Sequence, residues 1–262
     1  MDIIVCIKQV PGTAEVKINP ETNTLIREGV EAVINPFDLY ALEEAVKLKE
    51  ATNGKVTVMT MGPPQAENAL RDAVAVGADE VILITDRNFA GSDTWATSYT
   101  LARAVKKIGD YDLIICGKQA IDGDTAQVGP EMSEELDVPC VTNVSRIRET
   151  AEKSIILERM MEEGKQVIKL PLPSLITVVK EINTPRLPSL KGKMRARKQE
   201  IIKWNAADMA CELDRIGLQG SPTAVAKIFA PPQRTGGEIL QGDIETQVRK
   251  LIHSLREGMI IL

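Results

Sequence analysis

Residues 117–130, with the sequence GKQAIDGDTAQVGP, form the stretch best suited to chemistry. They follow an apolar run at 111–116 and precede a helix-forming segment at 131–136, so the order is strand, glycine-bearing loop and helix. Glycines let a backbone approach a ligand closely, and the free amides of residues 125–129 at a helix start form a concavity for anions. A phosphate or diphosphate fits such a loop.

The pattern alone leaves alternatives open. Neither G-x-G-x-x-G nor G-x-x-x-x-G-K-[ST] is present, so ordinary turn residues explain the loop as well as a phosphate site does. The helix could start with Asp124 as N-cap and Gln127 three residues on, or with Gly129 as N-cap and Pro130 first. We favour the second start, because a proline inside a helix costs about 3 kcal/mol. Asp122 and Asp124 should bind ribose hydroxyls or backbone amides, since carboxylates repel phosphates.

An alternation of strands and helices should position this loop. We expect buried strands at residues 2–8, 56–61, 81–85 and 112–116, and a hairpin at 16–19 and 25–27. Helices should run from Asn35, as a cap with Pro36 at the first position, from Gly62 to Gly77, and over 94–107. This pattern predicts a doubly wound α/β fold with a mostly parallel, Rossmann-like sheet, which binds ligands beyond the carboxyl ends of its strands.

The second half of the chain has a different pattern. Shorter strands follow Cys140, with a hairpin expected from 154–161 and 166–170 and a further strand at 175–179. Residues 184–199 contain six basic and no acidic residues, which is usually typical of a solvated surface. An extended linker from 231 leads to a last helix with one apolar face, formed by Ile244, Val248, Leu251, Ile252 and Leu255.

Composition limits the class of protein. The 262 residues are 44% hydrophobic and only 3% aromatic, which predicts one large or two small domains with an aliphatic core. The net charge of -5 argues against nucleic acid as the main partner. Four widely spaced cysteines without a C-x-x-C pair are typical of reduced cytosolic thiols. With no apolar run long enough for a signal peptide or a membrane span, we expect a soluble, cytoplasmic protein without membrane insertion.

Side-chain catalysis has no candidate in this sequence. His253 is the only histidine, and it lies on the expected last helix without a ligand cluster nearby. No Ser/His/Asp, Cys/His or metal constellation can be assembled. A redox cofactor held by the protein would then carry the chemistry.

Further motifs are VCIKQVP at 5–11, NPF at 35–37, MGP at 61–63, PR at 185–186 and PPQRT at 231–235. Together with GKQAID at 117–122 and the acidic, threonine and glutamine positions up to Gly129, this set resembles the β subunit of electron-transferring flavoprotein over nearly the whole chain. Several matches in the right order are far more specific than one loop. The resemblance implies a flavin shared with a larger α subunit.

The resemblance also implies an adenine-nucleotide pocket at the converging strand ends. The residues carried over are Cys6, Asn35, Pro36, Phe37, Asp38, Met61, Gly62, Gln119, Asp122, Gly123, Asp124, Thr125, Ala126, Gln127, Val128, Gly129, Pro130, Glu131, Met132 and Ser133. Structural explanations remain for some of them, with Cys6 as a core residue and Asn35 as only a cap.

Two branches of the family differ in this loop. Residues 123–130 look like the branch that binds a second FAD for electron bifurcation, and the missing side chain at Gly123 makes room for it. That branch would take a hydride from NADH and divide the electrons between ferredoxin and a flavin-dependent dehydrogenase, of the acyl-CoA or lactate dehydrogenase type. The alternative is a structural AMP that only supports the α-subunit flavin. A nucleotide-hydrolysing domain would need a metal or base that the sequence does not offer.

Two segments resemble the family's partner-binding parts. Residues 184–200 match its recognition segment, with an apolar anchor at Leu190 and basic residues Lys193, Arg195 and Lys198 suited to an acidic dehydrogenase surface. Residues 231–262 match an arm that packs on the α subunit, which leaves 1–230 as the α/β nucleotide-binding domain.

Overall fold

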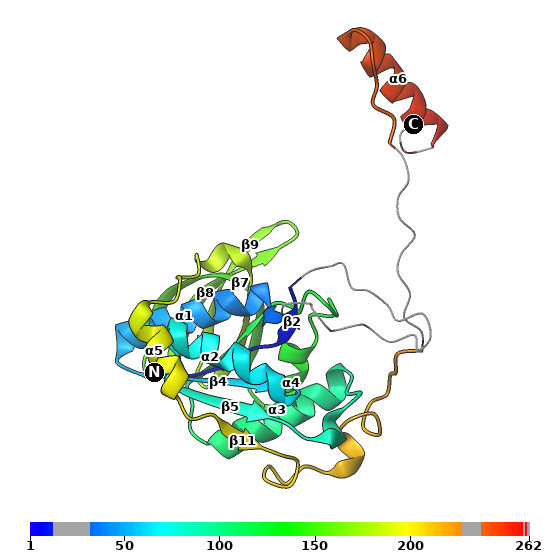
Figure 1. Ribbon diagram of the computed structural model, residues 1–262. Helices are drawn as coiled ribbons and strands as arrows, with labels where there is room; N and C mark the ends of the chain where they lie inside the picture. The colour runs from blue at the N-terminus through cyan, green and yellow to red at the C-terminus, as the bar shows by residue number, and fades with distance from the viewer. Residues whose placement is uncertain (13–31, 227–236, 259, 261–262) are drawn as a thin grey trace.

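The computed structural model describes residues 1–12, 32–226, 237–258 and 260. Its main sheet has nine strands in the order β11-β5-β4-β1-β6-β10-β7-β8-β9 (Figure 1). Neighbouring strands are parallel from β11 to β7, and β7, β8 and β9 are antiparallel. The predicted α/β class with a mostly parallel sheet is confirmed. The hairpin expected at 16–19 and 25–27 lies outside the described residues, as does the start of the linker at 231.

The strands of the main sheet are β1 Asp2–Cys6, β4 Lys55–Met61, β5 Glu80–Ile84, β6 Leu113–Gly117, β7 Cys140–Ala151, β8 Ser154–Met161, β9 Gly164–Pro171, β10 Ser174–Val178 and β11 Ile202–Trp204. A separate pair is formed by β2 Gln9–Pro11 and β3 Ala32–Ile34. The α-helices are α1 Pro36–Thr52, α2 Glu67–Val76, α3 Thr94–Ile108, α4 Val128–Leu136, α5 Leu190–Lys198 and α6 Ile244–Glu257.

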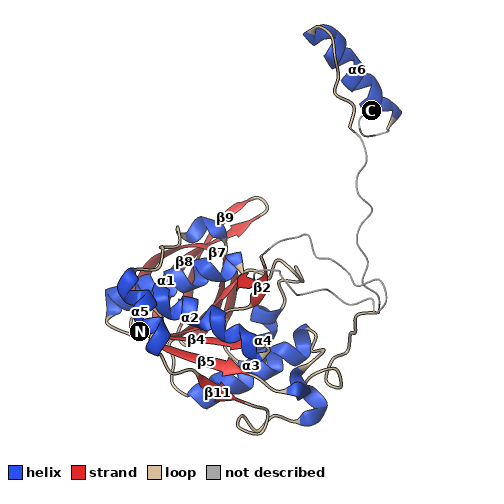
Figure 2. Cartoon of the chain, viewed as in Figure 1, coloured by secondary structure: helices blue, strands red, loops and turns tan. Residues whose placement is uncertain are grey.

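Helices cover both faces of the parallel part of the sheet (Figure 2). Side chains alternate along β1, so Ile3 and Val5 join the core with α1, α2 and α5, while Ile4 and Cys6 join the core with α3 and α4. Both cores are largely aliphatic, as the low aromatic content predicts. Two layers of helices on a parallel sheet leave the strand ends as the open edges of the fold.

The expected strands of the main sheet before residue 117 and the helix expected at 94–107 agree with the structure to within two residues at each end. The helix expected from Gly62 instead begins at Glu67, after a short 3-10 turn at Pro64–Ala66. Four strands and one helix were not predicted: the short pair β2 and β3, the long strand β7, the short edge strand β11 and helix α5. Helix α5 has a polar sequence with only Ala196 buried, so it lacks the apolar periodicity by which a helix is recognised. Within the residues described, no helix combines the length and apolar character needed to cross a bilayer.

Helix α6 has the predicted amphipathic pattern, but none of its residues is buried. Ile244 is 81% exposed, and Val248, Leu251 and Ile252 are also exposed. An apolar face on a helix gains stability only when another surface covers it. Among the described residues, no surface of this chain does so.

Candidate functional site

The strand order reverses at β1. The chain passes from β1 to β4 and β5 on one side, then crosses to β6 on the other side of β1. Such a switch point opens a crevice at the carboxyl ends of the two strands. Cys6, at the end of β1, is in register with Cys116, and Gly117 ends β6. The loop from 118 to 127 starts at this crevice, as the sequence predicts.

Asn35 ties helix α1 to this loop. It is 1% exposed, and its side chain makes no capping hydrogen bond to the helix. Instead, Nδ2 donates to the carbonyl of Gln119 at 2.9 Å, and Oδ1 accepts from the amide of Ile121 at 3.1 Å. Asn35 is thus the N-cap residue before Pro36, as predicted, but its side chain does not cap the helix. Asn35 holds the loop in place over the end of β6.

Asp38 joins the ends of β1 and β6. One carboxylate oxygen accepts from the amide of Lys8 at 2.7 Å, and the group also accepts from the amide of Gly117. Burial raises the pKa of Asp38 from 3.8 to about 7, against the lowering effect of these hydrogen bonds and of Asn35. The carboxyl group of Asp38 thus links three segments of the crevice.

Gly117 is required by this close packing. A Cβ at this position would lie 2.7 Å from the carbonyl carbon of Phe37 and 2.8 Å from the Cβ of Phe37, and would also collide with Asp38. Real Cβ atoms do not approach backbone atoms so closely, so any side chain would push α1 away from β6.

The loop itself is exposed and folded back on its own polar groups. Lys8 Nζ lies 2.7 Å from a carboxylate oxygen of Asp122, and the side chain of Gln119 donates to Asp124. Asp124 and Ala126 both have φ of 56°, the left-handed conformation that non-glycine residues adopt at some cost. Alternating left-handed residues turn successive amides toward one side, which is how anion-binding nests form.

Several amides of the loop remain available to a ligand. Within the part of the chain that the structure describes, no backbone or side-chain acceptor is bound by the amides of Thr125, Ala126 or Gln127. Gly123 faces open space, because no atom lies within 4 Å of a Cβ built there. The donor set and the room at Gly123 both fit a phosphate-bearing nucleotide.

Helix α4 begins between the two predicted starts. Gln127 is the N-cap and Val128 the first helical residue, so Pro130 occupies the third position. A backbone amide there would have no acceptor within the helix, so proline loses no hydrogen bond. Gly129 is buried in the first turn, and a Cβ there would lie 2.6 Å from Cγ2 of Thr177 on β10. The preference for Gly129 as N-cap was wrong; this glycine allows the helix to pack on the sheet.

The remaining predicted site residues lie around this start. Glu131 accepts from the hydroxyl groups of Thr94 and Ser98 on α3, at 3.1 and 3.0 Å. Ser133 donates to the carbonyl of Pro130, whereas Met132 is fully buried in the core. Met61 ends β4 and Gly62 follows it, on the far side of β1 from the loop. The structure thus places the loop, Cys6 and the start of α1 together.

The thiols of Cys116 and Cys140 are not activated. A hydrogen bond with Cys6 and burial raise the pKa of Cys116, and burial raises the pKa of Cys140 to about 11. Protonated thiols are poor nucleophiles and poor metal ligands at neutral pH. Among the described residues, no group of three or more His, Cys, Asp or Glu side chains is arranged to hold a metal ion.

Known proteins resemble this sequence over its full length. The model of the electron transfer flavoprotein domain matches residues 22–209. Over 262 residues, covering 100% of both chains, the sequence is 49% identical to "Electron transfer flavoprotein subunit beta" of Thermoanaerobacterium thermosaccharolyticum. The chain belongs to the electron transfer flavoprotein family, as a β subunit.

Two other relatives extend the comparison. The β subunit is 49% identical over 263 residues to "Caffeyl-CoA reductase-Etf complex subunit CarD" of Acetobacterium woodii, with 100% of both chains covered. It is also 45% identical over 262 residues to "Protein FixA" of Sinorhizobium fredii, covering 97% of this chain and 92% of that one.

The predicted recognition segment contains α5, which is anchored to α2. Arg195 donates to the carbonyls of Val74 and Ala78 at 2.6 and 2.7 Å, at the end of α2. Arg71 of α2 donates in return to the carbonyl of Ala196 at 2.7 Å. Each guanidinium satisfies carbonyls that a helix end leaves open. Leu190 is 78% exposed at the start of α5.

Sequence reasoning missed two features of these sites. Lys8, which follows β1, supports the loop through the hydrogen bond from its backbone amide to Asp38 and through its ion pair with Asp122. Arg195 is used within the chain, although it was predicted only as a partner contact, and that contact stays a prediction. No sequence signal identifies either role, because both depend on carbonyl or carboxylate groups distant in the chain.

Proposed function

We propose that this β subunit binds FAD in the crevice between β1 and β6 and takes part in electron bifurcation. In this proposal NADH is the donor, and ferredoxin and a flavin-dependent dehydrogenase are the acceptors, with the α subunit carrying the other flavin. The observation that carries the proposal is the open Gly123 beside three available amides at the switch point of the sheet.

The chain's own residues would have distinct tasks toward the nucleotide. The amides of 125–127 would receive the diphosphate at the start of α4, where the helix dipole favours negative charge. Asn35 and Asp38 would keep the loop and the end of β1 in fixed positions through the hydrogen bonds described above. A bound flavin would supply one- and two-electron chemistry, which no side chain of this site can provide.

The names of the relatives support an oxidoreductase complex. CarD is named as part of a caffeyl-CoA reductase complex, and a reductase coupled to an electron transfer flavoprotein is the type of assembly proposed here. The exposed apolar face of α6 supports association with the α subunit through residues 231–262, because a separate protein surface could bury it. Exposed Leu190, with basic residues beside it, supports docking of a dehydrogenase.

The experiment replaces Gly123 by aspartate in the complete αβ heterodimer. Since no atom lies within 4 Å of a Cβ at 123, the fold itself tolerates the change. A carboxylate there should repel a diphosphate, so flavin per heterodimer should fall from about two toward about one, and NADH-driven ferredoxin reduction should cease.

Gly123→Asn is the matched control for size without charge. An equal loss of flavin in both variants would assign the effect to the size of the new side chain. A loss of flavin only in Gly123→Asp would assign it to negative charge near the phosphates. Flavin content is counted after extraction, and the unfolding midpoint of each variant is measured in parallel. One FAD with one AMP in the wild-type heterodimer would overturn the bifurcation proposal.

A further inference from the structure

We propose that Arg186 is a positioning residue that fastens the docking segment, defined as residues 187–198, along helix α1. The inference rests on the proposed function in one respect, which is that this segment docks the dehydrogenase. The fastening itself is a property of the described chain and can be tested without any partner.

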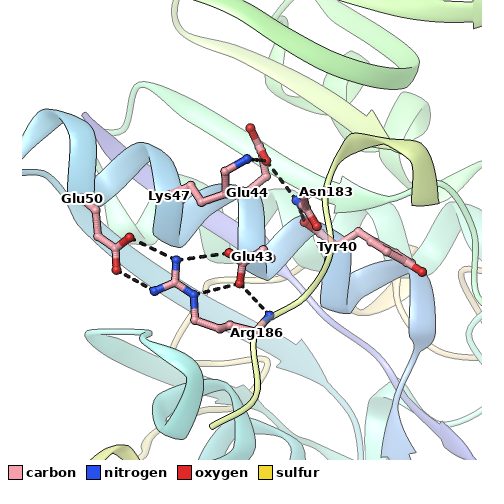
Figure 3. Close-up of polar contacts among 7 residues, drawn as sticks. All are labelled: Tyr40, Glu43, Glu44, Lys47, Glu50, Asn183 and Arg186. Atoms are coloured by element: carbon pink, nitrogen blue, oxygen red, sulfur yellow. Dashed lines mark hydrogen bonds and ion pairs between the residues drawn. The ribbon is translucent and has the colours of Figure 1, made fainter. Parts of the chain in front are cut away.

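Arg186 binds two carboxylates on α1, those of Glu43 and Glu50 (Figure 3). Toward Glu43 its Nε and Nη2 donate at 2.9 and 3.1 Å, and its backbone amide donates at 3.0 Å. Toward Glu50 its Nη1 and Nη2 donate at 2.6 and 3.1 Å. Both pairs are bidentate, the geometry in which arginine binds carboxylates most specifically.

The environment makes this contact stronger than an ordinary surface ion pair. The Glu43 side chain is 7% exposed and that of Arg186 33%, so water screens them only partly. The hydrogen bonds with Glu50 and Glu43 raise the pKa of Arg186, and the hydrogen bond from Arg186 lowers the pKa of Glu50. Losing Arg186 would leave the buried Glu43 without its partner, which costs more than losing an exposed pair.

A second contact aligns the chain before Arg186. Asn183 Nδ2 donates to the carbonyl of Tyr40 at 3.0 Å and to Glu44 at 2.9 Å (Figure 3). Asn183 and Arg186 thus hold one extended stretch against successive turns of α1. The docking segment begins at the next residue, and Leu187 and Leu190 are 89% and 78% exposed.

The contacts of Arg186 determine where the exposed side chains of Leu187 and Leu190 lie on the surface. Arg195 and Arg71 hold the later part of α5 to α2, whereas Arg186 holds its approach to α1. Because both ends of the docking segment are attached to the fold, few of its residues would lose conformational freedom on docking. Such losses reduce binding affinity. Arg186 therefore contributes to docking through position, with its charge already neutralised by Glu43 and Glu50.

The first test measures hydrogen exchange in the αβ heterodimer. Arg186→Gln should speed exchange of the amides around position 186, above all the amide of residue 186 itself, which donates to Glu43. We expect about tenfold or more, since the variant removes the side-chain hydrogen bonds to this buried carboxylate. Arg197→Gln is the control, because Arg197 is an exposed cation of the same segment and should leave these amides unchanged. Unchanged exchange in Arg186→Gln would overturn the fastening itself.

The second test separates position from charge. Its probe is the flavin-dependent dehydrogenase that co-purifies with the heterodimer, and its readout is KM against kcat for electron transfer to that enzyme. Glu50→Gln removes a negative charge near the segment, so by charge alone it should lower the KM for an acidic partner. If Arg186 positions the segment, Glu50→Gln should instead raise this KM about two- to fivefold with kcat unchanged.

Arg186→Gln should raise the same KM further, and Arg186→Lys should restore part of it, since lysine can pair with one carboxylate at a time. A lower KM in Glu50→Gln would overturn the positioning role in docking. Faster exchange in Arg186→Gln without any transfer to a dehydrogenase in the wild type would refute the proposed docking function and leave the fastening intact.

Discussion

Replacing Gly117 by alanine tests whether the crevice depends on close packing between β6 and α1. The new methyl group would lie 2.7 Å from the carbonyl carbon of Phe37 and would collide with Asp38. Overpacking of this kind costs about 1–3 kcal/mol. If the collision also displaces Asp38 from the amide of Lys8, the lost hydrogen bond adds about 1 kcal/mol. We expect the free energy of unfolding to fall by about 2–4 kcal/mol.

Gly123→Ala is the matched control, because its methyl group meets no atom within 4 Å. That variant should stay within about 0.5 kcal/mol of the wild type, as surface substitutions usually do. Urea unfolding of the two variants and the wild-type heterodimer measures the difference, and nucleotide content after gel filtration measures the site. Equal stability of Gly117→Ala and Gly123→Ala would refute the packing argument.

Three further predictions follow from the same contacts. Because burial raises the pKa of Asp38 to about 7, its protonated form is favoured in the folded state. The free energy of unfolding of the wild type relative to Asp38→Asn should therefore rise by about 1.4 kcal/mol per pH unit as pH falls from about 7 to about 4. Urea unfolding midpoints that change equally with pH in the two proteins would contradict this. Leu190→Ala should weaken transfer to the dehydrogenase and leave bound flavin intact; an equal loss of flavin would show that Leu190 serves the cofactor. A chain ending before residue 231 should keep its folded α/β body but no longer co-elute with the α subunit on a sizing column.

The sequence predicts those parts of the fold that short-range patterns determine. The segment at 62–77 was predicted as a helix, and its residues Ala66, Leu70, Ala73 and Val74, spaced at the helical period, are all buried. Their spacing depends only on the helical period, which is a local property. Helix α5 was missed for the converse reason: five of its nine residues are basic, only Ala196 is buried, and hydrogen bonds with α2 hold it in place.

Asn35 shows why the sequence predicts the position of the site but not the contacts within it. An asparagine before Pro36 is a typical cap, and local pattern offers no other acceptor or donor for its side chain. The fold brings Gln119, 84 positions away in the chain, within hydrogen-bond distance. Once the loop satisfies both ends of the amide group, the helix start relies on proline for its geometry.

The sequence of residues 184–199 likewise does not show which basic residues are already paired within the chain. The sequence shows six basic residues there, and all six were available to attract an acidic partner. The structure commits Arg186 to Glu43 and Glu50, and Arg195 to the carbonyls that end α2. Long-range attraction speeds encounter, whereas fixed contacts determine where an apolar anchor stands. Salt dependence of dehydrogenase docking should therefore follow the exposed cations such as Lys191 and Lys198, while Arg186 and Arg195 should act on affinity even at high ionic strength.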